Sequence, residues 1–135
     1  MRRRPALAAA LALAALLVGC RGEGDGSRSV ELTAKDDGRT VTAQPADVLI
    51  LRLDSNPTTG YEWSLTRKPD AAVLESLGHK YEPPETGLVG AGGVDVWRFR
   101  AIEDGNTSFE LKYGRPFGND PPAGSFSLTV DVSAA

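Results

Sequence analysis

Histidine and cysteine, two of the residue types used most often in catalysis and metal binding, are scarce in this 135-residue chain. It has one histidine, His79, and one cysteine, Cys20. One histidine is enough for a catalytic triad of serine, histidine and aspartate. A lone histidine in a strand-rich domain is more often a packing or surface residue. Metal sites need several ligands at matched spacings, and the sequence has no such set. We therefore expect no enzyme, no metal site and no cofactor.

Some carboxylates lie close together in the sequence, and two such pairs could suggest a site. Asp36 and Asp37 stand in an ordinary turn without the spacing of a calcium-binding loop. Glu82 and Glu85 flank a double proline, and such a pair could take part in acid–base chemistry. A solvated charged loop is the more common setting for such residues, so we predict no catalytic role for them.

A stiff turn precedes Trp63 and connects two apolar segments. Its residues are Asn56, Pro57, Thr58, Thr59, Gly60 and Tyr61. The side chain of Asn56 can close a turn, Pro57 fixes its own φ, and Gly60 allows a positive φ. The two threonines are β-branched and have little rotamer freedom to lose when a partner binds. The segment predicts a rigid, exposed turn suited to binding, and a hairpin turn chosen for geometry alone is the alternative.

A second loop follows the double proline and is rich in glycine. It ends in Gly90, Ala91, Gly92 and Gly93. Glycines let a backbone approach a partner closely and expose its own N–H and C=O groups. The spacing lacks the third glycine of a dinucleotide fingerprint and no helix follows, which excludes a phosphate cradle. Taken alone, the segment is also compatible with a flexible exposed loop.

A third loop contains Arg115, Pro116 and Phe117. The proline holds a cation and an aromatic ring at a fixed offset on a turn. Arginine and aromatic residues dominate the binding energy of many protein interfaces. The alternative is that Phe117 folds back to cap the domain while Arg115 pairs with a surface acid.

The N-terminus has the pattern of a secretory signal. Three arginines (residues 2–4) precede an apolar stretch of alanine and leucine (residues 6–18) that is too short for a comfortable membrane span. Small residues lead into Cys20 as in a bacterial lipobox, where the cysteine is lipidated. We predict a signal peptide at 1–19, a lipidated Cys20 with a flexible tether at 20–29, and one domain at 30–135. An ordinary signal peptide with a chance cysteine is the alternative.

Charge and composition limit the classes of partner that the chain is expected to bind. Without residues 1–19 the chain has 12 basic and 18 acidic residues, a net charge of −6. This sign disfavours nucleic acid. We expect a monomer that crosses the cytoplasmic membrane and is held at the bacterial cell envelope by its lipid.

The body of the chain consists of short apolar runs between turn residues, without sustained helical periodicity. Residues 30–34 and 40–43 flank a turn, and residues 47–53 are densely aliphatic. Apolar residues then alternate, and alternate residues of a strand face one buried layer. The alternating positions are Tyr61, Trp63 and Leu65; Trp97, Phe99 and Ala101; Phe109, Leu111 and Tyr113; and Phe126, Leu128, Val130 and Val132. Residues 71–77 are compatible with a helical turn or a strand. The pattern predicts an all-β, Ig-like sandwich of about seven or eight antiparallel strands.

Together the three loops resemble those of the chagasin family of cysteine protease inhibitors. The resemblance runs from about Val30 to Val132 and includes the Tyr81, Pro83 and Pro84 segment before the second loop. It implies that the loops lie side by side as a wedge in the active-site cleft of a papain-like protease. Tight, reversible, competitive inhibition is the activity that it implies.

The resemblance also implies a role for each loop. Thr58 and Thr59 would meet the catalytic cysteine and histidine of the protease, and the glycine-rich segment 90–93 would bind one side of the cleft. Arg115 and Phe117 would bind the other side. The family usually has tryptophan where this chain has Phe117, which keeps a ring but loses area and the indole N–H.

A binding module without inhibitory activity is the rival interpretation. An Ig-like domain of the cell envelope could bind a protein or a glycan through the same loops, because a fold does not determine a function. The two interpretations differ at Thr58 and Thr59, which an inhibitor needs exposed and rigid between the flanking loops.

Overall fold

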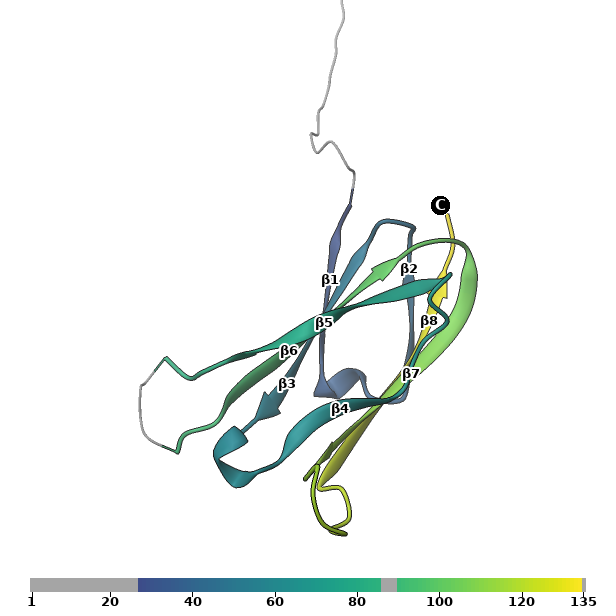
Figure 1. Cartoon of the computed structure of the whole chain (residues 1–135). Helices are drawn as coiled ribbons and strands as arrows, with labels where there is room; N and C mark the ends of the chain where they lie inside the picture. Colours follow the sequence, from purple (N-terminus) through teal and green to yellow (C-terminus); the bar gives the residue numbers. More distant parts are fainter. Residues whose placement is uncertain (1–26, 86–89, 135) are drawn as a thin grey trace, which may run out of the picture.

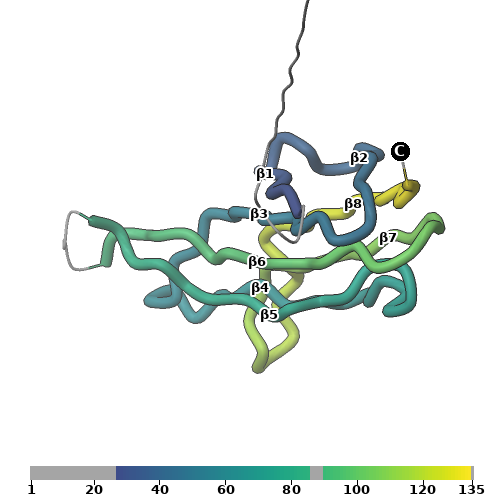
Figure 2. The backbone as a smooth tube through the Cα atoms, turned by 90° about the horizontal axis from the view of Figure 1, so that it is seen from above, coloured from purple at the N-terminus to yellow at the C-terminus, as the bar shows by residue number. Residues whose placement is uncertain are grey.

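The computed structural model describes residues 27–85 and 90–134, and these form a sandwich of two sheets. The two layers pack face to face, as Figures 1 and 2 show in views at right angles. This confirms the predicted all-β, Ig-like fold. The strands in the described ranges are β1 (Ser29–Thr33), β2 (Arg39–Ala43), β3 (Val48–Ser55), β4 (Glu62–Arg67), β5 (Leu74–Glu82), β6 (Gly93–Ala101), β7 (Gly105–Gly114) and β8 (Gly124–Val132), and the short 3₁₀ helices are η1 (Ala34–Asp36) and η2 (Pro57–Thr59).

The sheets are mixed, which differs from the predicted antiparallel pairing. One sheet has the order β1-β3-β6-β5 and the other β2-β8-β7-β4. β1 pairs with β3, and β2 with β8, in parallel. The turn at residues 36–38 is therefore not a hairpin, because the chain passes there from one sheet to the other. A capping box ends β1: the Thr33 hydroxyl accepts from the Lys35 N–H, and the Asp36 carboxylate accepts from the Thr33 N–H.

The core lies between the sheets and is made by the predicted alternation. The rings of Phe99 and Phe109 are fully buried and stack with centroids 4.2 Å apart, which joins β6 to β7 across the sandwich. Trp63 and Leu65 are partly buried against this core. Its buried members are Leu32, Ala43, Leu49, Leu51, Leu53, Val73, Leu74, Trp97, Phe99, Ala101, Phe109, Leu111, Phe126, Leu128, Val130 and Val132. All of them lie after residue 31, so a chain that starts at Arg21 keeps the whole core.

Residues 71–77, which the sequence left open between helix and strand, form a turn and then a strand. The Asp70 carbonyl oxygen accepts from the N–H groups of Val73 and Leu74, and its carboxylate accepts from the Ala72 N–H. β5 begins at Leu74, whose side chain is fully buried. The antiparallel pairing of Leu74–Ser76 with β6 makes this part of the segment a strand.

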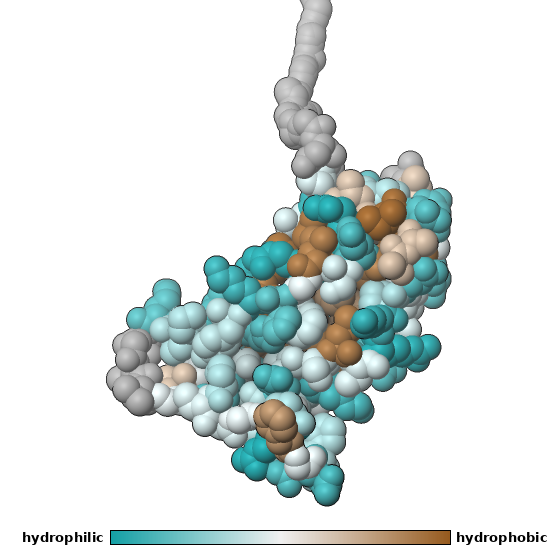
Figure 3. Space-filling view, viewed as in Figure 1, coloured by the Kyte–Doolittle hydropathy of each residue, from teal (hydrophilic) through white to brown (hydrophobic). Residues whose placement is uncertain are grey.

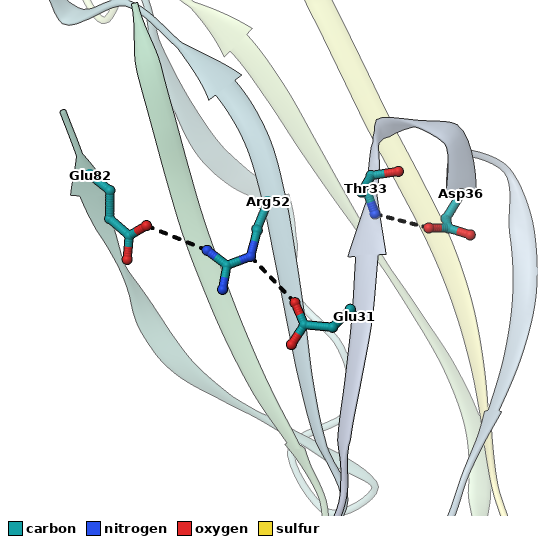
Figure 4. Close-up of polar contacts among 5 residues, drawn as sticks. All are labelled: Glu31, Thr33, Asp36, Arg52 and Glu82. Atoms are coloured by element: carbon teal, nitrogen blue, oxygen red, sulfur yellow. Dashed lines mark hydrogen bonds and ion pairs between the residues drawn. The ribbon is translucent and has the colours of Figure 1, made fainter. Parts of the chain in front are cut away.

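The outer face of the first sheet is tied together by a row of charges. Arg52 of β3 bonds Glu31 of β1 at 3.3 Å and Glu82 of β5 at 3.4 Å, so its two ion pairs extend across all four strands of the sheet (Figure 4). Val96 of β6 is the register partner of Arg52 and Lys80 and is 0% exposed, although it is outside the main core. The arrangement fixes the end of β5, where the second loop begins.

The face of the molecule drawn in Figure 3 is mostly hydrophilic, with scattered hydrophobic spots.

The end of the sandwich where β1 begins is held by a buried carboxylate. Asp47, 1% exposed, accepts from Arg28 at 2.7 Å and from the Gln44 N–H at 2.9 Å. The hydrogen bond from Arg28 holds the pKa of Asp47 below its ordinary value against the opposing effect of burial. Arg28 and Ser29, which the sequence analysis assigns to the tether, are thus bonded to the domain or paired in β1.

The predicted signal peptide (1–19), Cys20 and most of the tether lie outside the described residues. Within the parts of the chain that are described, no helix is long and apolar enough to cross a bilayer.

Candidate functional site

The first loop, Asn56–Tyr61, is a 3₁₀ turn held by its own polar groups. The Asn56 side-chain oxygen accepts from the Thr58 N–H at 3.2 Å, and Pro57 occupies the first position of η2. Gly60 ends the turn with φ +85° and ψ −5°, a left-handed conformation that glycine adopts without strain. Its N–H donates to the Pro57 carbonyl at 3.0 Å. The turn closed by an asparagine and the positive φ at Gly60 are both confirmed.

The two threonines are exposed, yet their hydroxyl protons are used inside the loop. Thr58 Oγ1 donates to Asn56 Oδ1 at 2.6 Å, and Thr59 Oγ1 donates to the Asn56 carbonyl oxygen at 2.7 Å. Neither hydroxyl is bonded to a histidine or a carboxylate that could act as a base. The tip is therefore built to be presented and not to attack a substrate.

The first loop is bonded to the second loop. Asn56 Nδ2 donates to the Gly90 carbonyl oxygen at 3.0 Å. Gly93 leaves no room for a side chain, because a Cβ there would lie 2.7 Å from Tyr81 Oη and against the Glu82 carbonyl oxygen. A hollow of about 460 Å³ lies beside this contact and is lined by Asp54, Ser55, Asn56, Gly92, Gly93 and Tyr113.

The third loop contacts the first loop through Arg115. Its guanidinium carbon lies 4.7 Å from the centre of the Tyr61 ring, and Nη2 is 3.5 Å from the Thr59 carbonyl oxygen. Nη1 donates to Asp120 at 2.8 Å. Phe117 is 85% exposed and does not cap the domain. The alternative interpretation of this loop is that Arg115 pairs with a surface acid and that Phe117 caps the domain. The first part is confirmed and the second is wrong.

Tyr113, at the end of β7, contacts the first loop, and the sequence placed it among the alternating positions without indicating this contact. Its hydroxyl oxygen accepts from the Asn56 N–H at 2.9 Å. Its ring stacks on Tyr61 at 5.5 Å and tilts against Trp63 at 5.0 Å. Trp63 in turn donates from its indole to the Asp54 carbonyl oxygen. A signal for this cluster is present in the sequence, because its three aromatic residues, Tyr61, Trp63 and Tyr113, lie where β4 and β7 meet their loops.

His79 is a packing residue. Its ring stacks on Trp97 with centroids 4.1 Å apart, and Nδ1 lies 2.9 Å from the buried carboxylate of Asp95. Asp95 also accepts from the Trp97 indole at 3.0 Å. Two polar groups thus satisfy a buried acid, and no serine hydroxyl or thiol bonds the histidine within the described residues. No cluster of three metal-ligating side chains occurs in the described ranges.

The three loops lie at one end of the sandwich, opposite the end where β1 begins (Figure 1). Asn56 bonds the second loop directly, while Tyr61 and Thr59 contact Arg115 of the third. The structure therefore places the three predicted binding loops at the same end of the sandwich. Cys20, the predicted lipid site, lies outside the described residues.

The described part of the chain is thus an all-β sandwich with three loops at one end, in which the first loop is bonded to each of the other two. The sequence model described as "Chagasin family peptidase inhibitor I42" matches residues 42–130, so this chain belongs to that family. The predicted family and the expectation that the chain is not an enzyme are both confirmed.

Relatives and solved structures agree with this assignment. The chain is 30% identical to Chagasin of Trypanosoma cruzi over 109 residues, which cover 78% of this chain and 98% of the relative. It is 32% identical to Amoebiasin-2 of Entamoeba histolytica over 103 residues, 75% of this chain and 81% of the relative.

Two solved structures share the fold over most of both chains. The cysteine protease inhibitor EhICP2 from Entamoeba histolytica is 20% identical, with a TM-score of 0.68 over 80% of this chain and 98% of that one. The Leishmania mexicana ICP is 29% identical, with a TM-score of 0.55 over 73% of this chain and 90% of that one.

Proposed function

We propose that this chain is a reversible, competitive inhibitor of papain-like cysteine proteases that inserts its three loops into the active-site cleft. The observation that carries the proposal is the bonding of Asn56 to its neighbours, which holds the exposed threonine tip beside the second loop and above Tyr113. Membership of the chagasin family supports it. So does the shared fold of PbICP-C, which was solved in complex with falcipain-2.

The geometry of the first loop explains inhibition without cleavage. A protease needs an extended peptide whose carbonyl oxygen can enter the oxyanion hole. Here the carbonyl oxygen of Asn56 accepts from the Thr59 N–H and hydroxyl, and that of Pro57 accepts from Gly60. The carbonyl oxygen of Thr59 faces Arg115. Extending the turn would break these bonds, so the loop covers the nucleophile without offering it a reactive carbonyl.

The test is a kinetic assay of the domain from Arg21 onward with papain at several substrate concentrations. We expect an apparent inhibition constant that rises linearly with substrate, full recovery of activity on dilution, and an intact inhibitor chain by mass spectrometry. Binding to papain without loss of activity would favour the rival binding module. No inhibition at about 10 μM would contradict the proposal.

We also propose that Cys20 is lipidated and that the domain is a monomer held at the bacterial cell envelope. β1 begins at the end opposite the loops (Figure 1), so an anchor attached before it would leave the loops pointing away from the membrane. We expect Cys20→Ser to move the protein from the membrane fraction to the soluble fraction. Retention of the Cys20→Ser variant in the membrane fraction would contradict lipid anchoring, and a dimer by light scattering would contradict the monomer.

Phe117 offers a separate test of the third loop. Its ring is exposed, so a larger ring can be accommodated without repacking. If the loop binds the protease, Phe117→Trp adds contact area and an indole donor and should tighten inhibition by about threefold.

A further inference from the structure

The third loop carries an ion pair that the proposed binding role of Arg115 leaves unexplained. Arg115 and Asp120 are five residues apart, and Nη1 and Oδ2 lie at 2.8 Å, the distance of a strong charged hydrogen bond. Their side chains are 45% and 52% exposed. The pair therefore closes the loop that bears Phe117.

Arg115 already has three partners within the domain. One guanidinium nitrogen bonds Asp120, another faces the Thr59 carbonyl oxygen, and the flat face of the group lies over the Tyr61 ring. A protease carboxylate that paired with either of these nitrogens would compete with Asp120 or with the Thr59 carbonyl oxygen. Its contacts instead join the third loop to the first.

Glu62 is the other acid beside this loop. It lines the same hollow as Arg115 and Asp120, at the start of β4, but forms no ion pair with Arg115 in the described structure. Asp120 is thus the residue that neutralises the cation and orients it toward Tyr61. Glu62 provides a matched control of equal charge and similar location.

We propose that Asp120 is a positioning residue that holds Arg115 as a clamp between the third and first loops, so that Arg115 acts within the inhibitor and not as a contact to the protease. The inference rests on the proposed inhibition and changes the role that the sequence predicts for Arg115. A loop that is ordered before binding has less conformational entropy to lose. The resulting gain in affinity appears mainly as slower dissociation of the complex.

The sign of one substitution separates the two roles. If Arg115 is a clamp, Asp120→Asn loosens the loop and raises the inhibition constant by about two- to fivefold, the range of an exposed ion pair, through a faster dissociation rate. If Arg115 contacts the protease, the same substitution frees a cation for that contact and leaves the inhibition constant unchanged or lower. Glu62→Gln, which removes the same charge, should change neither rate.

A double-mutant cycle gives a second readout. In an Arg115→Gln background, Asp120→Asn should have no further effect, because the carboxylate then has no cation to hold. Additive losses from the two substitutions would overturn the clamp.

NMR of the free domain from Arg21 onward tests the clamp without a protease. Backbone ¹⁵N relaxation should show residues 117–119 rigid in the wild type and mobile on the ps–ns timescale in Asp120→Asn, but not in Glu62→Gln. Equal mobility in all three proteins would overturn the inference even if inhibition is observed. If the wild type inhibits no papain-like protease while its loop is rigid and the variant loop mobile, the clamp stands and the proposed function fails.

Discussion

The first and second loops lie side by side but are built on different principles. The first is closed on itself: Asn56 caps it, Gly60 ends it, and both threonine hydroxyls donate back to Asn56. The described part of the second loop is joined to the first by the bond from Asn56 to Gly90 and rests on Gly93, which packs against β5. One loop has its shape fixed before binding, and the other offers exposed backbone.

The difference suggests a division of labour in the proposed inhibitor. A tip that blocks a nucleophile must not deform into a substrate, so its turn is fixed by many short bonds. A flanking loop that contacts a cleft through backbone groups gains from adapting to its surface. Substitutions that strain or release the first loop should therefore affect inhibition more than those in the second.

The largest effect is expected from Gly60→Val. At φ +85° a β-branched residue should cost about 1–2 kcal/mol, and a turn distorted in response should weaken inhibition by about tenfold or more. Gly38→Val is the matched control, since Gly38 has φ +80° and its N–H donates to the Ser127 carbonyl oxygen on β8, outside the three loops. Both variants should unfold at lower denaturant, but the inhibition constant should rise for Gly60→Val alone. An unchanged constant for Gly60→Val would contradict the account of a fixed turn.

Asn56→Ala is expected to have the second-largest effect. It removes the cap on Thr58 and the bond to Gly90, with a loss of about 1–1.4 kcal/mol or up to about tenfold in the inhibition constant. Asn56→Asp keeps the acceptor for Thr58 and removes the donor to Gly90. If the second loop adapts, Asn56→Asp should lose much less inhibition than Asn56→Ala. Equal losses would show that the link between the loops is the important bond.

Tyr113→Phe should have a moderate effect. The substitution keeps the stacked ring and leaves the Asn56 N–H without its partner, at about 1 kcal/mol or fivefold in inhibition. Tyr61→Phe is the control, because the Tyr61 hydroxyl has no hydrogen bond in the described structure while its ring contacts Arg115. In inhibition assays the inhibition constant should rise for Tyr113→Phe and stay unchanged for Tyr61→Phe. Equal behaviour would mean that the Tyr113 hydroxyl does not position the first loop.

The smallest effect on inhibition is expected from Asp47, at the opposite end. Its pKa is lowered in the folded state, so its contribution to stability is present above the unfolded value near 3.8 and is lost as the pH falls through the folded value. Asp47→Asn should lower the free energy of unfolding at pH 7 by about 1–3 kcal/mol and reduce its dependence on pH below 4. The inhibition constant at pH 7 should stay unchanged. A rise would indicate that the two ends are coupled.

Local patterns in the sequence predicted the parts of the structure that local chemistry controls. Alternation placed Phe99, Phe109 and Phe126 in the core, and the turn at Asn56 with a positive φ at Gly60 followed from residue types alone. The parallel pairing of β1 with β3, and of β2 with β8, could not be predicted in this way, because it depends on strands that are distant in the sequence. The same holds for Tyr113, whose hydroxyl meets a residue 57 positions earlier.

The claim that the threonine tip reaches the catalytic cysteine has a direct test. Cys20 is the chain's one cysteine, so a domain from Arg21 onward with Thr58→Cys carries one thiol, at the exposed tip of the first loop. Under mild oxidation we expect a disulfide between this thiol and the catalytic cysteine of papain, reversed by reductant and identified by mass spectrometry. Asp131→Cys, exposed on β8, should form none at the same concentration. If the Thr58→Cys domain inhibits papain yet is crosslinked no faster than the Asp131→Cys domain, the tip does not lie at the nucleophile and the account is wrong.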